Sequence, residues 1–187
     1  MVHRVVILAS GAGTLAQSIF DANNLDIAIV AVISDRKEAF VLERAQVCGI
    51  HTEIIPVIGS RQLWNTEIFE RVTAYKPDLV VSTGFMRILP ADFVNRFPTI
   101  NIHPSLLPDF PGAHAVRDAL AAGVSVTGTS VHWVDAGVDT GPLITQMEVP
   151  VLPGDDEISL HERIKQVERG LIVATIALIL PTLECNV

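Results

Sequence analysis

The chain has 187 residues, of which 49% are hydrophobic and 18% are charged, and its formal net charge is -8. This length suits one domain with a large buried core, and the composition excludes a disordered chain. The negative charge repels a phosphodiester backbone, so we expect no nucleic acid partner.

The sequence also lacks the features of an exported or membrane protein. The N-terminal apolar run at residues 5–9 is too short for a signal peptide, and the most apolar stretch, residues 171–180, is about half the length that crosses a bilayer. The two cysteines, Cys48 and Cys185, show neither a disulfide framework nor the spacing of a zinc site. We therefore predict a cytoplasmic protein with no membrane partner and no metal.

Apolar runs alternate with segments of helical character along the first hundred residues. Strands are predicted at 5–9, 27–33, 52–56, 79–82 and 99–103, with helices between them at 14–22, 40–48 and 63–75. The second half adds a helix at 114–122, strands at 126–134 and 144–149, and a final helix at 158–180. This pattern predicts an α/β fold with a doubly wound, mostly parallel sheet and helices on both faces. A ligand site is then expected at the carboxyl ends of the strands.

A glycine-rich turn at residues 10–14 follows the first predicted strand and begins the first helix. Glycines there let the backbone approach an anion, and the free N–H groups at the start of a helix can bind phosphate. Extended to Ala16 the turn reads G-x-G-x-x-A, and Asp35 ends the next strand, so a dinucleotide site is an alternative. A tight turn without any ligand is the other alternative.

Two polar side chains share one face of the fifth predicted strand. Asn101 and His103 are two residues apart, so both project to the same side near the carboxyl end of that strand. An amide beside an imidazole can stabilise an oxyanion and move a proton. A purely structural role for the pair is the alternative.

Two loops could complete a pocket around this pair. Residues 84–90 follow the fourth strand with mostly apolar groups around one arginine, where a flat heterocycle could slot in, although an ordinary buried connection is equally consistent. Residues 106–112 form a proline-rich loop too apolar to be simply solvated, which could wall a pocket.

Other acidic and imidazole side chains are candidates of a weaker kind. A carboxylate near His103 would orient its ring, but periodicity alone favours Asp135 and Asp139 as turn formers. For His114 and His132 the structural interpretation is also favoured.

Four blocks of the sequence, at residues 6–14, 84–89, 101–108 and 132–142, together resemble the phosphoribosylglycinamide formyltransferase family. The resemblance implies a Rossmann-like formyltransferase fold in a single domain over residues 1–187, with a nucleotide-binding half (1–100) and a catalytic and folate-binding half (101–187). It also implies transfer of a formyl group from 10-formyltetrahydrofolate, as co-substrate, to the amine of 5'-phosphoribosylglycinamide in purine synthesis. Such an enzyme needs no metal, binds only small-molecule substrates, and would be a monomer or homodimer.

The resemblance also assigns roles to individual residues. It implies a catalytic trio of Asn101, His103 and Asp139. The positions implied for the nucleotide are Gly11, Gly13, Thr14, Leu15, Gly84, Pro104 and Glu168. Those implied for the folate are Arg61, Met86, Arg87, Ile88, Leu89, Asn101, Asp135, Ala136, Gly137, Val138 and Asp139.

The chain departs from the family pattern at three places. Many members have Asn at the position of Leu15 and a second His at the position of Val116, so phosphate contacts from those two side chains are not expected here. Many members also continue beyond the position of Val187 into a short strand pair, which concerns only edge packing.

Four rival functions remain open at this stage. A dinucleotide-dependent reductase would use the glycine turn but gives Asn101 and His103 no role. Methionyl-tRNA formyltransferase and formyltetrahydrofolate hydrolase resemble this chain around Asn101, but we expect a basic RNA-binding domain in the first and a regulatory domain in the second, for which this chain has no room. A non-catalytic nucleotide-binding module is disfavoured because all three catalytic positions are filled.

Overall fold

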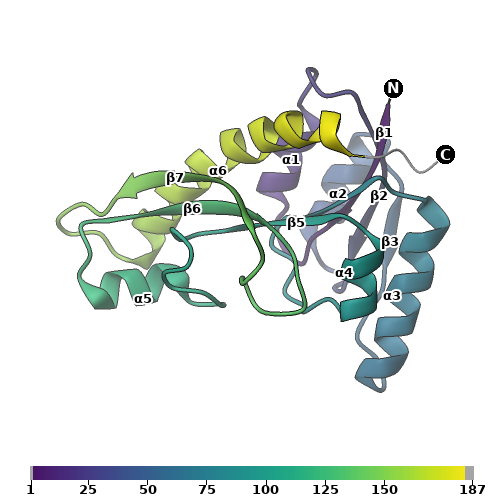
Figure 1. The fold of residues 1–187 in the computed structure, drawn as a ribbon, viewed down its shortest axis with the longest axis horizontal. Helices are drawn as coiled ribbons and strands as arrows, with labels where there is room; N and C mark the ends of the chain where they lie inside the picture. Colours follow the sequence, from purple (N-terminus) through teal and green to yellow (C-terminus); the bar gives the residue numbers. More distant parts are fainter. Residues whose placement is uncertain (1, 184–187) are drawn as a thin grey trace.

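The computed structural model describes residues 2–183, so Cys185 lies outside the described residues. It contains a seven-stranded sheet in the order β3-β2-β1-β4-β5-β6-β7 (Figure 1). The first five strands pair in parallel, whereas β6 pairs antiparallel with both of its neighbours. The strands are β1 (His3–Leu8), β2 (Ile27–Ser34), β3 (Thr52–Ile54), β4 (Leu79–Ser82), β5 (Thr99–His103), β6 (Val126–Trp133) and β7 (Leu143–Pro150).

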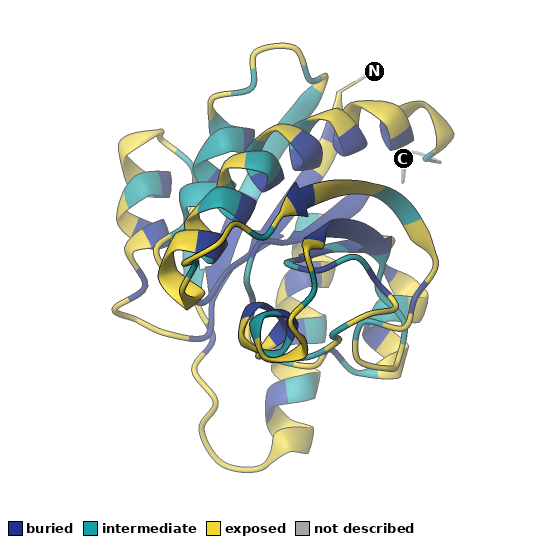
Figure 2. Ribbon diagram, turned by 90° about the vertical axis from the view of Figure 1, so that its left-hand side faces the viewer, coloured by how far each residue is buried: buried dark blue, intermediate teal, exposed yellow. Residues whose placement is uncertain are grey.

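Helices cover both faces of this sheet, which confirms the predicted fold class. They are α1 (Thr14–Phe20), α2 (Phe40–Val47), α3 (Arg61–Tyr75), α4 (Ala91–Arg96), α5 (Ala115–Ala122) and α6 (Glu157–Ile179), followed by a short 3-10 helix (Leu180–Thr182). Side chains of α1, α2 and α6 form one apolar cluster with the sheet, and side chains of α3 and α4 form a second cluster on the opposite face. Figure 2 shows the result, with buried residues along the central strands and exposed residues on the outer helix surfaces and on the edge strand β7.

The alternating direction of side chains along each strand divides the core between the two faces. On β1, Val5 and Ile7 belong to the cluster under α1, α2 and α6, whereas Val6 and Leu8 belong to the cluster under α3 and α4. All four side chains are fully buried. A strand buried on both faces reads as a continuous apolar run, which is why β1 is recognisable in the sequence.

The sequence pattern missed α4, a helix of six residues directly after Pro90. A helix this short presents less than two turns, so its periodicity carries little signal. It is held by tertiary packing, because Phe93 is fully buried and its ring meets that of Phe97 edge-on with centroids 4.9 Å apart. The remaining helices and strands were predicted with boundaries shifted by a few residues.

The two glycines of the turn between β1 and α1 have different structural environments. Gly13 has a φ of +72°, and a Cβ there would lie 2.5 Å from the Cβ of Val41 on α2. Gly11 has open space around the position of a Cβ. Gly13 is therefore required for the close approach of α1 and α2, whether or not a ligand binds to the turn.

We expect Gly13→Ala to lower the free energy of unfolding by about 2–4 kcal/mol, since it adds left-handed strain to a collision with Val41. Gly11→Ala is the matched control and should change it by less than about 1 kcal/mol. Urea denaturation of both variants measures the difference. Equal losses in the two variants would contradict this account of Gly13.

Candidate active site

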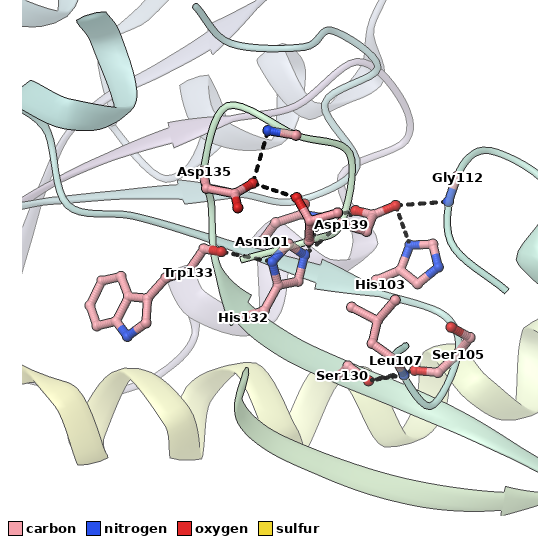
Figure 3. A network of polar contacts seen from close by, with 12 residues as sticks. Asn101, His103, Ser105, Leu107, Gly112, Ser130, His132, Trp133, Asp135 and Asp139 are labelled. Carbon is pink, nitrogen blue, oxygen red and sulfur yellow. Dashed lines mark hydrogen bonds and ion pairs between the residues drawn. The ribbon is translucent and has the colours of Figure 1, made fainter. Parts of the chain in front are cut away.

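The antiparallel pairing of β5 with β6 creates a polar cluster at the carboxyl end of β5. Asn101 lies opposite His132 in the register, and His103 lies opposite Ser130. The amide nitrogen of Asn101 is 3.3 Å from Nε2 of His132. Figure 3 shows these side chains gathered beneath the loop that carries Asp139.

Asp139 joins the members of this cluster through both of its carboxylate oxygens. Its Oδ2 lies 3.3 Å from Nδ1 of His103 and accepts a 2.8 Å hydrogen bond from the backbone N–H of Gly112. Its Oδ1 lies 3.4 Å from the Asn101 amide nitrogen and 3.5 Å from Nε2 of His132. The backbone of Asp139 has a positive φ of 54°, a conformation that aspartate tolerates better than most residues. This turn, between β6 and β7, thus aims one carboxylate back at β5.

The surroundings keep Asp139 ionised at neutral pH. Burial opposes ionisation and is the largest single influence on its pKa. The hydrogen bonds from His132 and Gly112, together with the nearby charge of His103 and His132, outweigh that burial and hold the pKa of Asp139 below its ordinary value. The site therefore has a fixed anion beside an imidazole.

Both ring nitrogens of His103 face oxygen atoms. Nδ1 faces the Asp139 carboxylate, and Nε2 lies 2.8 Å from the carbonyl oxygen of Phe110. A doubly protonated ring can donate to both oxygens at once, so the arrangement accommodates the imidazolium form. Phe110 and Gly112 both belong to the proline-rich loop. Their contacts with His103 and Asp139 use backbone atoms, so the sequence pattern does not predict them.

His132 is a member of this cluster that the sequence pattern assigned to a structural role. Its Nδ1 lies 2.8 Å from the Trp133 carbonyl oxygen, and its Nε2 faces the Asn101 amide nitrogen at 3.3 Å and Oδ1 of Asp139 at 3.5 Å. The signal that could have found it is its position on a strand next to β5. His114, by contrast, is exposed at the start of α5 and has no hydrogen bond from its side chain to the α5 backbone.

The segment expected to hold the folate lies directly beside the glycine turn. The backbone N–H of Ser10 donates to the carbonyl oxygen of Gly84 at 3.1 Å. Met86 and Ile88 are 61% and 52% exposed, so their side chains are available to a ligand, whereas Leu89 is buried in the core. Leu89 could therefore contact a ligand only through its backbone.

Arg61 contacts this segment, and the loop before β7 carries the other residues expected for the folate. The Arg61 guanidinium donates to the carbonyl oxygen of Ile88 and lies over the ring of Trp64. Asp135 forms the turn, since its Oδ1 accepts from the N–H of Gly137 at 2.9 Å and from the hydroxyl of Thr140 at 2.8 Å. Asp135 thus matches the turn-forming interpretation, while Asp139 points into the cluster.

The side chains at the two positions that depart from the family pattern pack into the core. Leu15 contacts the apolar cluster beneath α1, α2 and α6, and Val116 is buried with Val149, Leu160 and Ile164. A hollow of about 420 Å³ lies beside the glycine turn, between Ser10 to Ala12 and the start of α2. Arg36 and Phe40 also line it.

The alternative of a dinucleotide site fails at Asp35. Its Oδ1 accepts from the Ser10 hydroxyl at 2.5 Å, and its Oδ2 accepts from Nε of Arg87 at 2.7 Å. The Asp35 side chain has no exposed surface, so it cannot reach a ribose hydroxyl. Among residues 2–183, no three His, Cys, Asp or Glu side chains are grouped so that they could hold a metal ion. None of the described helices combines the length and apolar character that crossing a membrane requires.

Glu168 on α6 is buried next to Thr129 of β6. Its Oε1 is 3.4 Å from the hydroxyl of Thr129, which also lies 3.1 Å from the carbonyl oxygen of His103. Burial raises the pKa of Glu168 to about 7, while the hydrogen bond with Thr129 partly opposes that rise. A protonated Glu168 can donate to Thr129, whose own hydrogen then serves His103, so all three groups are satisfied.

The raised pKa of Glu168 makes stability depend on pH. Below pH 4.5 the Glu168 carboxyl is protonated in both the folded and the unfolded chain. Between pH 4.5 and about 7 the unfolded chain has lost this proton while the folded chain still holds it. The free energy of unfolding therefore falls as the pH rises through this range. We expect Glu168→Gln to remove this loss, so that the free energy of unfolding of the variant exceeds that of the wild type by an amount that grows to about 3 kcal/mol between pH 4.5 and 8. Urea denaturation at several pH values measures it, with the exposed Glu162→Gln on the same helix as control. A pH-independent difference between Glu168→Gln and the wild type would contradict the raised pKa.

Comparison with known proteins agrees with this geometry. A family model described as formyl transferase matches residues 3–176. The phosphoribosylglycinamide formyltransferase of Mycobacterium tuberculosis (strain ATCC 25618 / H37Rv) is 51% identical over 180 residues, which cover 93% of this chain and 83% of that protein. The enzyme of the same name from Escherichia coli (strain K12) is 42% identical over 174 residues, covering 89% of this chain and 82% of that one.

A solved structure matches the fold as well. The crystal structure of glycinamide ribonucleotide transformylase 1 from Symbiobacterium toebii superposes with a TM-score of 0.91 at 41% identity, covering 94% of this chain and 86% of that one. These matches confirm the resemblance carried by the four sequence blocks. This chain belongs to the formyl transferase family.

Proposed function

We propose that this chain transfers a formyl group from 10-formyltetrahydrofolate to the amine of 5'-phosphoribosylglycinamide in purine synthesis. The observation that carries the proposal is the cluster of Asn101, His103 and Asp139, in which one carboxylate contacts both of the other groups. The products are formylglycinamide ribonucleotide and tetrahydrofolate. The names of the close relatives support the choice of substrates.

The reaction begins when the neutral amine attacks the formyl carbon, which places negative charge on the formyl oxygen. The Asn101 amide donates to this oxyanion, and the protonated ring of His103 does so through Nε2, which must exchange the Phe110 carbonyl oxygen for the oxyanion. Asp139 orients the ring through Nδ1, and it helps an ordered water to pass the proton from the amine to the departing folate nitrogen. The Asn101 amide makes only long contacts, at 3.3 and 3.4 Å, so little is lost when it turns to the oxyanion.

The two substrates would bind beside the loops that follow the neighbouring strands β1 and β4. The ribose phosphate would meet backbone N–H groups at the glycine turn, and the nucleotide would extend past Gly84 and Pro104 toward Glu168. The folate would lie between residues 86–89 and the turn at 135–139, with Arg61 beside it. The chain is then one catalytic domain, with a nucleotide-binding half at 1–100 and a catalytic half at 101–187, that acts in the cytoplasm as a monomer or homodimer without a metal.

The direct test mixes the purified protein with 10-formyltetrahydrofolate and 5'-phosphoribosylglycinamide. We expect the absorbance change of folate deformylation only when both substrates are present. Formylation of methionyl-tRNA, or release of formate without the amine, would instead assign one of the rival reactions. The tRNA and the folate alone are therefore included as parallel samples.

We expect His103→Ala and Asp139→Asn each to lower kcat by about 10²–10³, because each removes a preorganised part of the oxyanion and proton pathway. Both side chains fill little of the apolar core, so circular dichroism should report a folded protein. His114→Ala is the matched control, since that ring is exposed and outside the cluster. Wild-type rates in either cluster variant would remove that residue from the mechanism.

A further inference from the structure

The carboxyl end of β2 contributes a buried acid for which the proposed reaction has no role. Asp35 directly follows β2, and its side chain has no exposed surface. A buried carboxylate is costly unless cations and hydrogen-bond donors surround it. Its two partners, Ser10 and Arg87, come from two different loops of the candidate site.

The first partner connects Asp35 to the backbone of the folate segment. Ser10 donates its hydroxyl hydrogen to Oδ1 of Asp35 at 2.5 Å. The same hydroxyl oxygen accepts from the backbone N–H of Met86 at 2.9 Å. Asp35 therefore fixes the direction of the Ser10 hydroxyl, and that hydroxyl fixes the position of residue 86.

The second partner fixes the next residue of the same segment. Arg87 donates through Nε to Oδ2 of Asp35 at 2.7 Å, in an ion pair whose acidic member is fully buried. Two consecutive residues, 86 and 87, are thus held by one carboxylate. The side chains of Met86 and Ile88 remain exposed above this anchor.

The strand order explains why one carboxylate can reach both loops. β1 lies between β2 and β4 in the sheet, so the ends of these three strands are adjacent. Ser10 also begins the glycine turn, and its backbone N–H is bonded to Gly84. The Asp35 contacts therefore tie the proposed nucleotide turn to the proposed folate segment.

We propose that Asp35 is a positioning residue that sets the place of residues 86–89 against the glycine turn and thereby the affinity for the folate substrate. The inference rests on the proposed function, because it assigns the folate to that segment. Ser10 and Arg87 donate to different oxygens of Asp35, and an asparagine has an acceptor oxygen at only one of these two positions. Its amide group would face one of these donors with its own hydrogens.

The test compares Asp35→Asn with Asp78→Asn. Asp78 is equally buried, at 3% exposure, but it bonds the backbone of Arg4 at the opposite end of the sheet. We expect Asp35→Asn to raise the KM for 10-formyltetrahydrofolate about tenfold, with kcat changed less than about threefold, since one charge-assisted hydrogen bond is lost away from the reacting atoms. Asp78→Asn should leave this KM unchanged even where it lowers stability.

A second variant and a second readout keep the inference open to refutation. Ser10→Ala removes the hydroxyl that accepts from Met86 and donates to Asp35, but it leaves the Arg87–Asp35 ion pair in place, so it should raise the same KM by a smaller factor, about threefold. Hydrogen exchange at the Met86 amide should be faster in Asp35→Asn and Ser10→Ala than in Asp78→Asn. Equal exchange, or equal folate KM values, in Asp35→Asn and Asp78→Asn would overturn the inference. A wild-type protein without formyl transfer would instead contradict the proposed function, while the exchange rates would still decide whether Asp35 anchors the segment.

Discussion

The candidate site depends on how the Asp139 carboxylate is used. One oxygen contacts the ring of His103 and the N–H of Gly112, and the other contacts Asn101 and His132. These groups come from two strands and one loop, so the carboxylate joins segments that no local interaction would bring together. Because its pKa is held below the ordinary value in spite of burial, the anion that makes these contacts is present throughout the neutral range.

Much of the fold could be predicted because its constraints are local or periodic. The strand β1, for example, is an unbroken apolar run that ends at a glycine turn, and both features follow from burial on two faces and a tight connection to a helix. The pair Asn101 and His103 was also accessible, since a spacing of two residues on a strand defines a common face. Such features can be predicted without knowing which residues contact them in the folded chain.

The features that could not be predicted depend on tertiary neighbours. His132 joins the cluster only because β6 pairs antiparallel with β5 in a particular register. Asp35 has the position of a ribose-binding acid in the sequence, yet Ser10 and Arg87 occupy both of its oxygens. Gly13 looks like a ligand-binding glycine, whereas the nearest obstacle to a side chain there is Val41. In each case the contacting residue comes from a distant part of the chain, so the sequence pattern alone does not identify it.

The acidic composition argues against a polyanionic partner more strongly than against a single phosphate. A nucleic acid meets the field of the whole chain, whose formal charge is -8, whereas one phosphate depends on donors within a few ångströms, and charges beyond roughly 10 Å are largely screened at physiological salt. At the glycine turn, Arg44 donates to the carbonyl oxygen of Ala12 at 2.9 Å, so a cation already engages that oxygen. Arg36 lines the hollow beside the turn. Because Leu15 packs against the core and Val116 is buried in it, recognition of a phosphate here would have to come from the backbone, the Thr14 hydroxyl and these arginines, and the overall charge of the protein would matter little to it.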